Sequence, residues 1–158
     1  MSLFNFTAFS DLATADLYDI LKLRTNVFVV EQNCPYPELD DKDKDGIHVY
    51  CKDENEMLAV ARILPAGISY KEWSFGRIAT HKKSRGTGLG KELMTACMNF
   101  MKLNHPAESV RISAQSHLEK FYGSFGFVST GKNYLEDGIP HIEMLFEPKV
   151  SKFMAKNL

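Results

Sequence analysis

An arginine and three glycines stand close together near the middle of the chain, at Arg85, Gly86, Gly88 and Gly90. The apolar residues that follow recur at helical spacing up to about residue 104. The N-terminus of a helix presents backbone N–H groups without internal partners and carries about half a positive charge. Glycines let an anion approach these groups, and an arginine adds a cation. The spacing therefore predicts a phosphate or diphosphate site, because a turn that only joins a strand to a helix does not require three glycines and a cation.

Two other phosphate-binding patterns fit this segment poorly. A P-loop has a glycine five residues before a Gly-Lys pair and a hydroxyl residue after it, but here Arg85 precedes Gly90 and Lys91, and Glu92 follows them. A dinucleotide-binding turn has GxGxxG in the first crossover of a doubly wound sheet, whereas GTGLG follows several expected strands. The pattern disfavours magnesium-dependent nucleotide hydrolysis and dinucleotide binding.

The glycine-rich segment needs a strand before it and a helix after it, and the flanking sequence predicts both. Residues 73–80 read as a strand, a helix of roughly fifteen residues begins at the glycines, and a strand at 110–114 completes a central βαβ crossover. The predicted class is mixed α/β. The other expected elements are an opening strand at 4–8, a helix with Thr14 as N-cap, a loop at 33–39, a charged turn at 40–46, strands at 47–51 and 57–64, a short helix at about 116–124, and strands at 127–130 and 141–146.

The composition is that of one globular domain of ordinary character. The 158 residues are 44% hydrophobic and 25% charged, and the formal net charge of −1 draws the protein to neither nucleic acid nor an anionic membrane. Three cysteines without a CxxC pair favour a reducing compartment, and residues 1–11 lack the features of a signal peptide. We therefore expect a cytoplasmic protein with one domain at 6–149 and a C-terminal tail at 150–158.

Two motifs resemble the GNAT (Gcn5-related) N-acetyltransferases. The pattern Arg-x-x-Gly-x-Gly, formed by Arg85, Gly88 and Gly90 after GRIAT, is similar to the acetyl-CoA loop of that family. QSHLEKFYGSFGF at 115–127 is similar to the downstream helix, where a tyrosine stands a few residues before a Gly-Phe pair. LRTNVFVVEQNCPY and EDGIPHIEM are similar to the ElaA-like branch. The resemblance implies a GNAT fold, with a mixed, mostly antiparallel central sheet flanked by helices and acetyl-CoA bound at the central βαβ crossover.

The resemblance also implies an acetyl-CoA-dependent N-acetyltransferase, in which an amine attacks the thioester directly in a ternary complex. Tyr122 would protonate the departing thiolate, and a phenol of reference pKa ~10 can protonate a thiolate of pKa ~8.5. Core packing beside Phe121 and Phe125 is the alternative role for Tyr122. Gln115 stands where many relatives have an asparagine. The implied co-substrate-binding residues are Ile78, Ala79, Thr80, Arg85, Gly86, Thr87, Gly88, Leu89, Gly90, Lys91 and Gln115.

The sequence offers several candidates for the general base. Many family members have a glutamate on the strand before the loop, but Phe75, Gly76 and Arg77 provide no carboxylate. A histidine or a carboxylate elsewhere could accept the proton through water, although a lone histidine is more often a structural hydrogen-bonding residue. The candidates are Glu31, His48, His117, His141 and Glu143.

Two charged residues are candidates for contact with substrate. Arg24 lies on an apolar helical stripe, where it could orient a carboxylate or phosphate of the substrate or cofactor, or extend from the edge of the stripe to solvent. Glu31 would line the acceptor pocket by resemblance, and a solvated carboxylate at a helix end is the alternative.

The segment DKDKDG at 41–46 matches the first half of a calcium-binding loop. Lys52 occupies the twelfth position, where a bidentate glutamate is required. We therefore expect a hydrated turn of mixed charge and no metal site.

The missing strand carboxylate also favours a second function, a non-catalytic acyl-CoA-binding or sensing module of the same fold. A third possible function is the binding of nucleotide phosphates by a protein unrelated to CoA. The acceptor is left open among small amines, amino acids, antibiotic-like compounds and protein lysines, because a fold does not specify a substrate. No nucleic-acid or membrane partner is expected, and exposed strand edges allow a homodimer.

Overall fold

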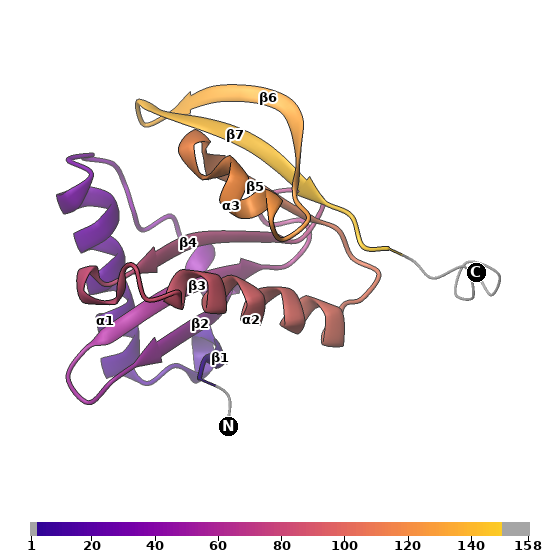
Figure 1. Cartoon of the computed structure of the whole chain (residues 1–158). Helices are drawn as coiled ribbons and strands as arrows, with labels where there is room; N and C mark the ends of the chain where they lie inside the picture. The colour runs from indigo at the N-terminus through magenta and orange to yellow at the C-terminus, as the bar shows by residue number, and fades with distance from the viewer. Residues whose placement is uncertain (1–2, 150–158) are drawn as a thin grey trace.

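Two antiparallel sheets meet along one pair of strands (Figure 1). The structure is a computed structural model and describes residues 3–149, so the expected tail at 150–158 lies outside the described residues. The first sheet has the order β1-β2-β3-β4, with strands Asn5–Ala8, Ile47–Lys52, Met57–Leu64 and Ser74–Thr80. The second has the order β5-β7-β6, with strands Val110–Gln115, Ile139–Phe146 and Val128–Glu136.

Helices connect and cover these strands. The helices are α1 (Thr14–Thr25), which continues as a π-helical turn at Asn26–Glu31, α2 (Leu89–Asn104) and α3 (Glu119–Gly123). Single 3-10 turns lie at Phe9–Asp11, Lys42–Asp45, Lys82–Ser84 and Ser116–Leu118. None of the helices in the described range is long and apolar enough to span a membrane.

The predicted elements agree with the structure apart from some of their ends; β7, for example, begins at Ile139 and not at residue 141. Ala13, in extended conformation, precedes α1, so the expectation of Thr14 as the N-cap is wrong by one residue. Strand β6 extends to Glu136, beyond the predicted end at residue 130. Its second half is exposed and has no alternation of apolar residues, because β6 is held by pairing with β7 rather than by a buried face.

The first sheet is covered on both faces. Val49 of β2 packs with Leu93 and Cys97 of α2, whereas Tyr50, the next residue, packs with Leu23 of α1. Alternate residues of a strand point to opposite faces, so both helices need apolar strand residues beneath them. This double coverage explains why β3 is an almost unbroken apolar run.

The two sheets are joined at one point and then diverge. Trp73 and Val110 form a parallel bridge, and the backbone N–H of Arg111 donates to the Trp73 oxygen at 2.8 Å. The predicted βαβ crossover, β4-α2-β5, is confirmed, but the predicted central sheet is divided at this crossover. In the described part of the chain, β4 pairs in a ladder with β3 alone, so its other edge faces the space between the sheets.

A β-bulge shapes the exposed edge of β4. Val60 and Arg62 of β3 oppose Ala79 and Gly76, so β4 contains one extra residue in this interval. Arg77 lies in the interval with a φ of +52°, a conformation that non-glycine residues adopt rarely. Bulges of this kind re-aim side chains, often beside functional sites.

Candidate functional site

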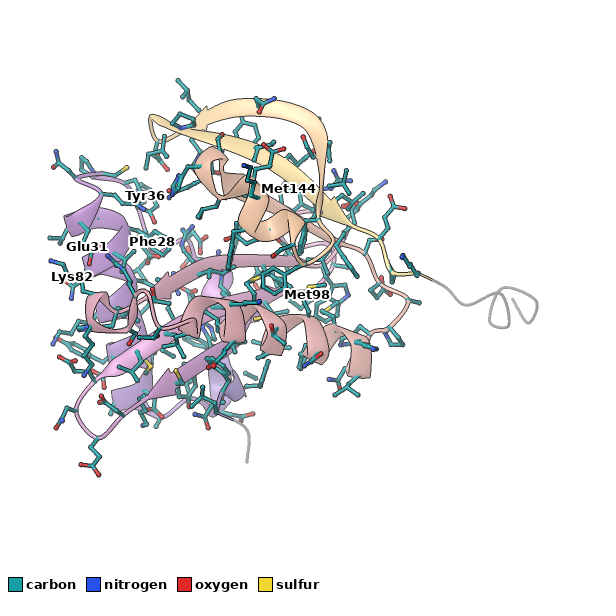
Figure 2. All side chains as sticks on the ribbon, viewed as in Figure 1. Phe28, Glu31, Tyr36, Lys82, Met98 and Met144 are labelled. Carbon is teal, nitrogen blue, oxygen red and sulfur yellow. The ribbon has the colours of Figure 1, made fainter. Side chains whose placement is uncertain are left out.

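A cleft of about 760 Å³ lies where β4 and β5 diverge, and this volume is in the range of small-molecule sites. Its walls come from β4, β5, the segment after α1, the short helix α3 and the β6–β7 hairpin. Phe28, Glu31 and Tyr36 lie on the wall that the end of α1 and the following loop form (Figure 2). The sequence-predicted residues that line the cleft are Glu31, Ile78, Ala79, Thr80, Arg85, Gln115, His117, Tyr122 and His141.

The glycine-rich loop lies at the end of β4, as its sequence predicts. Gly86 and Gly88 have φ values of +78° and +87°, and Gly88 precedes α2 without a capping side-chain hydrogen bond. A Cβ atom at Gly90 would lie 3.9 Å from Thr80 Cγ2, which shows how close the loop is to the strand end. The expected residues 86–91 are not among the residues that line the cleft; they form the start of α2 and the loop before it. The uncapped N–H groups at this helix start are available to an anion.

Arg85 connects the two walls of the cleft. Its Nη2 atom donates to Glu31 Oε2 at 2.7 Å and to the Thr80 backbone oxygen at 3.1 Å. Glu31 therefore has a partner across the cleft, and as the sequence alternative expects it is an exposed carboxylate at a helix end. Gln115, on β5, donates from Nε2 to Gln32 Oε1 at 3.2 Å, which is a second contact across the cleft.

Tyr122 is packed in the core and also lines the cleft. Its ring packs edge-on against Phe121 and Phe127, and the residue is only 7% exposed, yet it lines the cleft. No residue in the described range 3–149 forms a hydrogen bond with its hydroxyl. Burial, with a smaller contribution from the charge of Cys97, raises the pKa of Tyr122 to about 12. The phenol therefore stays protonated over the whole neutral range.

A carboxylate–imidazole pair lies on the hairpin wall of the cleft. His141 Nε2 is 3.1 Å from Glu136 Oε2, and its Nδ1 donates to the Ile139 backbone oxygen at 2.7 Å. The imidazole ring also stacks on Tyr134, with ring centroids 6.2 Å apart. Because a carbonyl oxygen only accepts hydrogen bonds, Nδ1 carries a proton and Nε2 is the nitrogen that faces Glu136. Sequence reasoning missed Glu136, although the Asp137–Gly138 turn beside it, with φ values of +49° and +78°, is a recognisable hairpin signal.

Two of the predicted base candidates do not line the cleft. His48 is buried on the α1 side of the first sheet, where its Nε2 donates to the Asp43 backbone oxygen at 2.9 Å and burial lowers its pKa. Glu143 accepts hydrogen bonds from Arg111 at 3.1 Å and Thr130 at 2.6 Å. Both side chains are used in structural contacts, so neither is a base for a reaction in the cleft.

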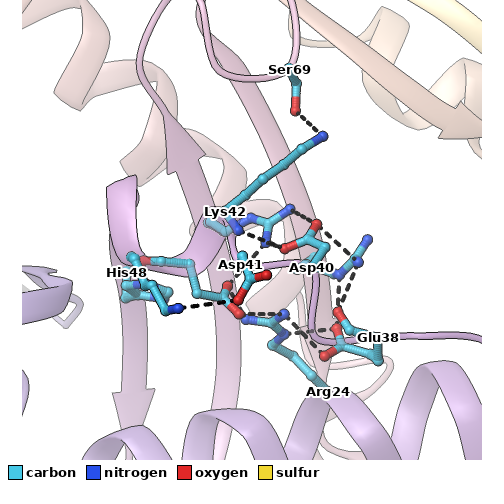
Figure 3. Close-up of polar contacts among 11 residues, drawn as sticks. Arg24, Glu38, Asp40, Asp41, Lys42, His48 and Ser69 are labelled. Atoms are coloured by element: carbon cyan, nitrogen blue, oxygen red, sulfur yellow. Dashed lines mark hydrogen bonds and ion pairs between the residues drawn. The ribbon is translucent and has the colours of Figure 1, made fainter.

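Arg24 has a structural environment that neither sequence alternative described. The residue is 1% exposed and is absent from the cleft wall. Its Nε lies 2.9 Å from Glu38 Oε1, and its Nη1 lies 2.7 Å from Asp43 Oδ1 (Figure 3). Extension to solvent is therefore wrong, and the guanidinium already has two carboxylate partners in place of a substrate anion.

Asp43 also corrects the expectation for the segment DKDKDG. It is 6% exposed and accepts hydrogen bonds from both Arg24 and Arg62. Burial alone would raise the pKa of Asp43, but the hydrogen bonds and charges of Arg24 and Arg62 outweigh burial and hold the pKa below its ordinary value. The turn is thus anchored to the fold and is not simply hydrated.

The same network reaches the cleft through Arg77. Arg77 Nε lies 2.8 Å from Glu38 Oε1, its Nη2 lies 3.3 Å from Asp40 Oδ2, and its guanidinium is 5.6 Å from the Tyr36 ring centre. Asp40 in turn pairs with Arg62 at 2.7 Å. The strand β4 therefore presents an arginine that binds two carboxylates from the loop after α1. Lining residues that the sequence did not single out include Tyr36, Asp40, Lys42, Arg62, Ser69, Tyr70, Arg77 and Glu136.

Comparisons with known proteins agree with this architecture. A model of the acetyltransferase (GNAT) domain matches residues 22–148. Protein ElaA from Escherichia coli (strain K12) is 40% identical over 140 residues, which cover 87% of this chain and 92% of that protein. The crystal structure of Escherichia coli ElaA has a TM-score of 0.85 and 38% identity, covering 93% of this chain and 100% of that one. The crystal structure of an acyl-CoA N-acyltransferase from Pseudomonas aeruginosa has a TM-score of 0.85 and 36% identity, covering 90% and 98%. The resemblance that the sequence motifs predicted is confirmed.

Proposed function

The chain belongs to the GNAT acetyltransferase family, and on this premise we propose that it transfers an acetyl group from acetyl-CoA to an amine by direct attack in a ternary complex. The main support is one arrangement in the cleft. A free strand edge, an uncapped helix start and a protonated tyrosine without a hydrogen-bonding partner among residues 3–149 adjoin a single cavity. These are the groups that a diphosphate, an extended amide-containing arm and a departing thiolate require.

Acetyl-CoA would bind along β4. Its diphosphate would accept hydrogen bonds from backbone N–H groups of residues 86–90, since that of Arg85 already donates to the Lys82 oxygen. Its pantetheine arm would pair with the free edge at Ile78, Ala79 and Thr80. An anionic diphosphate would also compete with Glu31 for Arg85, which lies at the junction of loop and cleft. The positive end of the α2 dipole would stabilise the bound diphosphate, since no side chain caps the N–H groups there.

We expect the substitution Gly88→Ala to weaken CoA binding roughly tenfold. A side chain at a φ of +87° costs about 1–2 kcal/mol, so the loop would move away from the conformation that points its N–H groups outward. Titration calorimetry with CoA measures the effect. Gly131→Ala is the matched control, because Gly131 has a similar φ of +89° and lies in strand β6 and not in the glycine-rich loop. Equal CoA affinity of Gly88→Ala and the parent protein would contradict this role of the loop.

The pair of Glu136 and His141 is our proposed base. An amine acceptor arrives as an ammonium ion of reference pKa ~10.4 if it resembles lysine, so it must lose a proton before it attacks. The Glu136 carboxylate is about half exposed, and His141 Nε2 is 3.1 Å from it. A proton can pass to this pair directly or through water. Glu31 and His117 also line the cleft, but Glu31 is already paired with Arg85.

Release of CoA thiol from acetyl-CoA in the presence of a panel of amines tests the proposed function. An N-acetyltransferase releases thiol in proportion to the amine acetylated, and it forms the amide product. The second candidate is an acyl-CoA-binding or sensing module, which the absence of a carboxylate at Phe75, Gly76 and Arg77 favours. Such a module would bind CoA in calorimetry and release no thiol with any amine, and this result would overturn the proposed catalysis. Cytoplasmic location and a homodimer stay predictions.

A further inference from the structure

Lys42 differs from the other cations that line the cleft. Arg62 pairs with Asp40, Arg77 with Glu38, and Arg85 with Glu31. The Lys42 ammonium, by contrast, has no carboxylate partner within residues 3–149. Its one hydrogen bond runs from Nζ to Ser69 Oγ at 2.9 Å. The cleft therefore contains a cation that is free to pair with an anionic group of a ligand.

The neighbouring carboxylates explain why Lys42 is unpaired. Asp40 and Asp43, on either side in the sequence, are held by Arg62 and Arg24. Asp40 Oδ1 also accepts the backbone N–H of Lys42 at 3.1 Å. The lysine side chain extends away from these carboxylates to Ser69, as Figure 3 shows. Arginines therefore bind Asp40 and Asp43, and Asp41 pairs with Lys44. The Lys42 ammonium is left at the cleft wall.

Beside Lys42 and Ser69, the Asp40 carboxylate is already paired with Arg62, and Tyr70 and Arg62 add hydrogen-bond donors. Tyr70 follows Ser69 and lines the cleft, and burial is the largest of the causes that raise its pKa to about 12, so its phenol stays neutral. Arg62 is 4% exposed and lines the same wall, and its Nε–H has no hydrogen-bond partner within residues 3–149. A buried donor without a partner is costly unless a ligand satisfies it or lies nearby.

Carboxylates occupy the adjoining hairpin wall. Tyr70 interacts with Tyr134 and Glu136 of β6, so the Ser69–Tyr70 segment is next to the hairpin. Glu136, with His141, and Asp137 line this part of the cleft. This end of the cleft thus presents the Lys42 ammonium on one side and the carboxylates of Glu136 and Asp137 on the other. This charge distribution complements a molecule that carries both an amino group and a carboxylate.

We propose that Lys42 and Ser69 bind the carboxylate of the acceptor, so that the acceptor is an amino acid or a similar amino carboxylate whose amine lies toward Glu136 and His141. This inference rests on the proposed N-acetyltransferase function. A carboxylate between an ammonium and a hydroxyl receives a charge-assisted hydrogen bond, which provides both affinity and orientation. A plain amine of the same size lacks this contact and would bind less tightly.

Acceptor pairs that differ only in the carboxylate test the inference. The assay measures acetylation of the standard amino acids and of the corresponding amino-acid amides, with acetyl-CoA as donor. For the preferred acceptor we expect kcat/KM to exceed that of its amide about 10- to 100-fold. Lys42→Met should remove this preference by raising KM for the amino acid, with kcat and the KM for the amide nearly unchanged. Lys42→Arg should retain part of the preference.

Lys44→Met is the matched control, because Lys44 is two residues away, 65% exposed and paired with Asp41 outside the cleft. This control should leave kcat/KM unchanged for both the amino acid and its amide. Equal or better use of amides by the parent protein would overturn the carboxylate site and leave the proposed acetyl transfer intact. Calorimetric titration of the CoA-saturated protein with the same panel gives a second readout. If no amine releases thiol, acetyl transfer fails; amino-acid binding that Lys42→Met abolishes would still support the site, and binding that is absent or independent of Lys42 would overturn it.

Discussion

Replacing Tyr122 with phenylalanine is expected to lower kcat for acetyl transfer about 10²- to 10⁴-fold, with little change in the affinity for CoA. The hydroxyl makes no hydrogen bond with a residue in the described range, so its removal leaves no partner unsatisfied. The ring keeps its packing against Phe121 and Phe127. The loss should therefore fall on proton donation to the leaving thiolate and not on folding.

The high pKa of Tyr122 is compatible with this role. Burial raises the pKa of the Cys97 thiol to about 12, close to the value of about 12 for Tyr122. Cys97 shows what burial at this depth does to a thiol, and a CoA thiolate held in the same surroundings would have its pKa raised in the same direction. A higher pKa of the thiolate favours proton transfer to it from the phenol.

Steady-state kinetics of thiol release, with CoA titrations in parallel, measure the effect. Tyr18→Phe is the control, because Tyr18 is 70% exposed and does not line the cleft. Since the pKa of Tyr122 is about 12, the parent enzyme should lose no activity through ionisation of this group between about pH 6 and pH 9. Undiminished kcat in Tyr122→Phe would contradict the role of the phenol as proton donor.

Replacing Arg24 with methionine is expected to lower the free energy of unfolding by about 3–5 kcal/mol. The substitution removes the charge while keeping much of the side-chain volume. It takes one arginine away from each of two buried carboxylates, Glu38 and Asp43. An incompletely paired buried carboxylate is costly, because it has lost its hydration without full compensation. Urea unfolding at pH 7 gives the measurement.

The control for this substitution is an ion pair at the surface. Lys44 and Asp41 are 65% and 90% exposed, and exposed pairs contribute about 0–1 kcal/mol. Lys44→Met should therefore change the free energy of unfolding far less than Arg24→Met. If the two variants unfolded at the same urea concentration, the buried network would not be the anchor of the loop at 33–46.

The effect of Arg24→Met should also depend on pH. The pKa of Asp43 in the folded protein lies below its ordinary value of 3.8, and hydrogen bonding to Arg24 is the largest cause that lowers it against the opposing effect of burial. A group of this kind contributes stability that is complete above its unfolded pKa and is lost as the pH falls through the folded pKa. The difference between the parent protein and Arg24→Met should therefore be largest near neutral pH and shrink below about pH 4.

The strand, the glycine-rich loop and the helix start beside the cleft are the part that the sequence predicts well. They are contiguous in the chain, so local patterns are enough to place them. Tyr122 was identified by a motif of similar locality. The acid and base groups were predicted less well, because Glu31, His117 and His141 line the cleft whereas His48 and Glu143 are bound elsewhere in the fold.

The sequence by itself determined the order of the elements, the βαβ crossover and the place of the glycine-rich loop, since these depend on periodicity and on neighbouring residues. Only the tertiary structure decided which charges are satisfied. Arg24 is buried because Glu38 and Asp43 reach it from a loop 14 and 19 residues away. Lys42 has no carboxylate partner within residues 3–149, because arginines from other elements bind Asp40 and Asp43 beside it. Pairing and burial of a charge depend on contacts between distant segments, and neither composition nor local spacing encodes them.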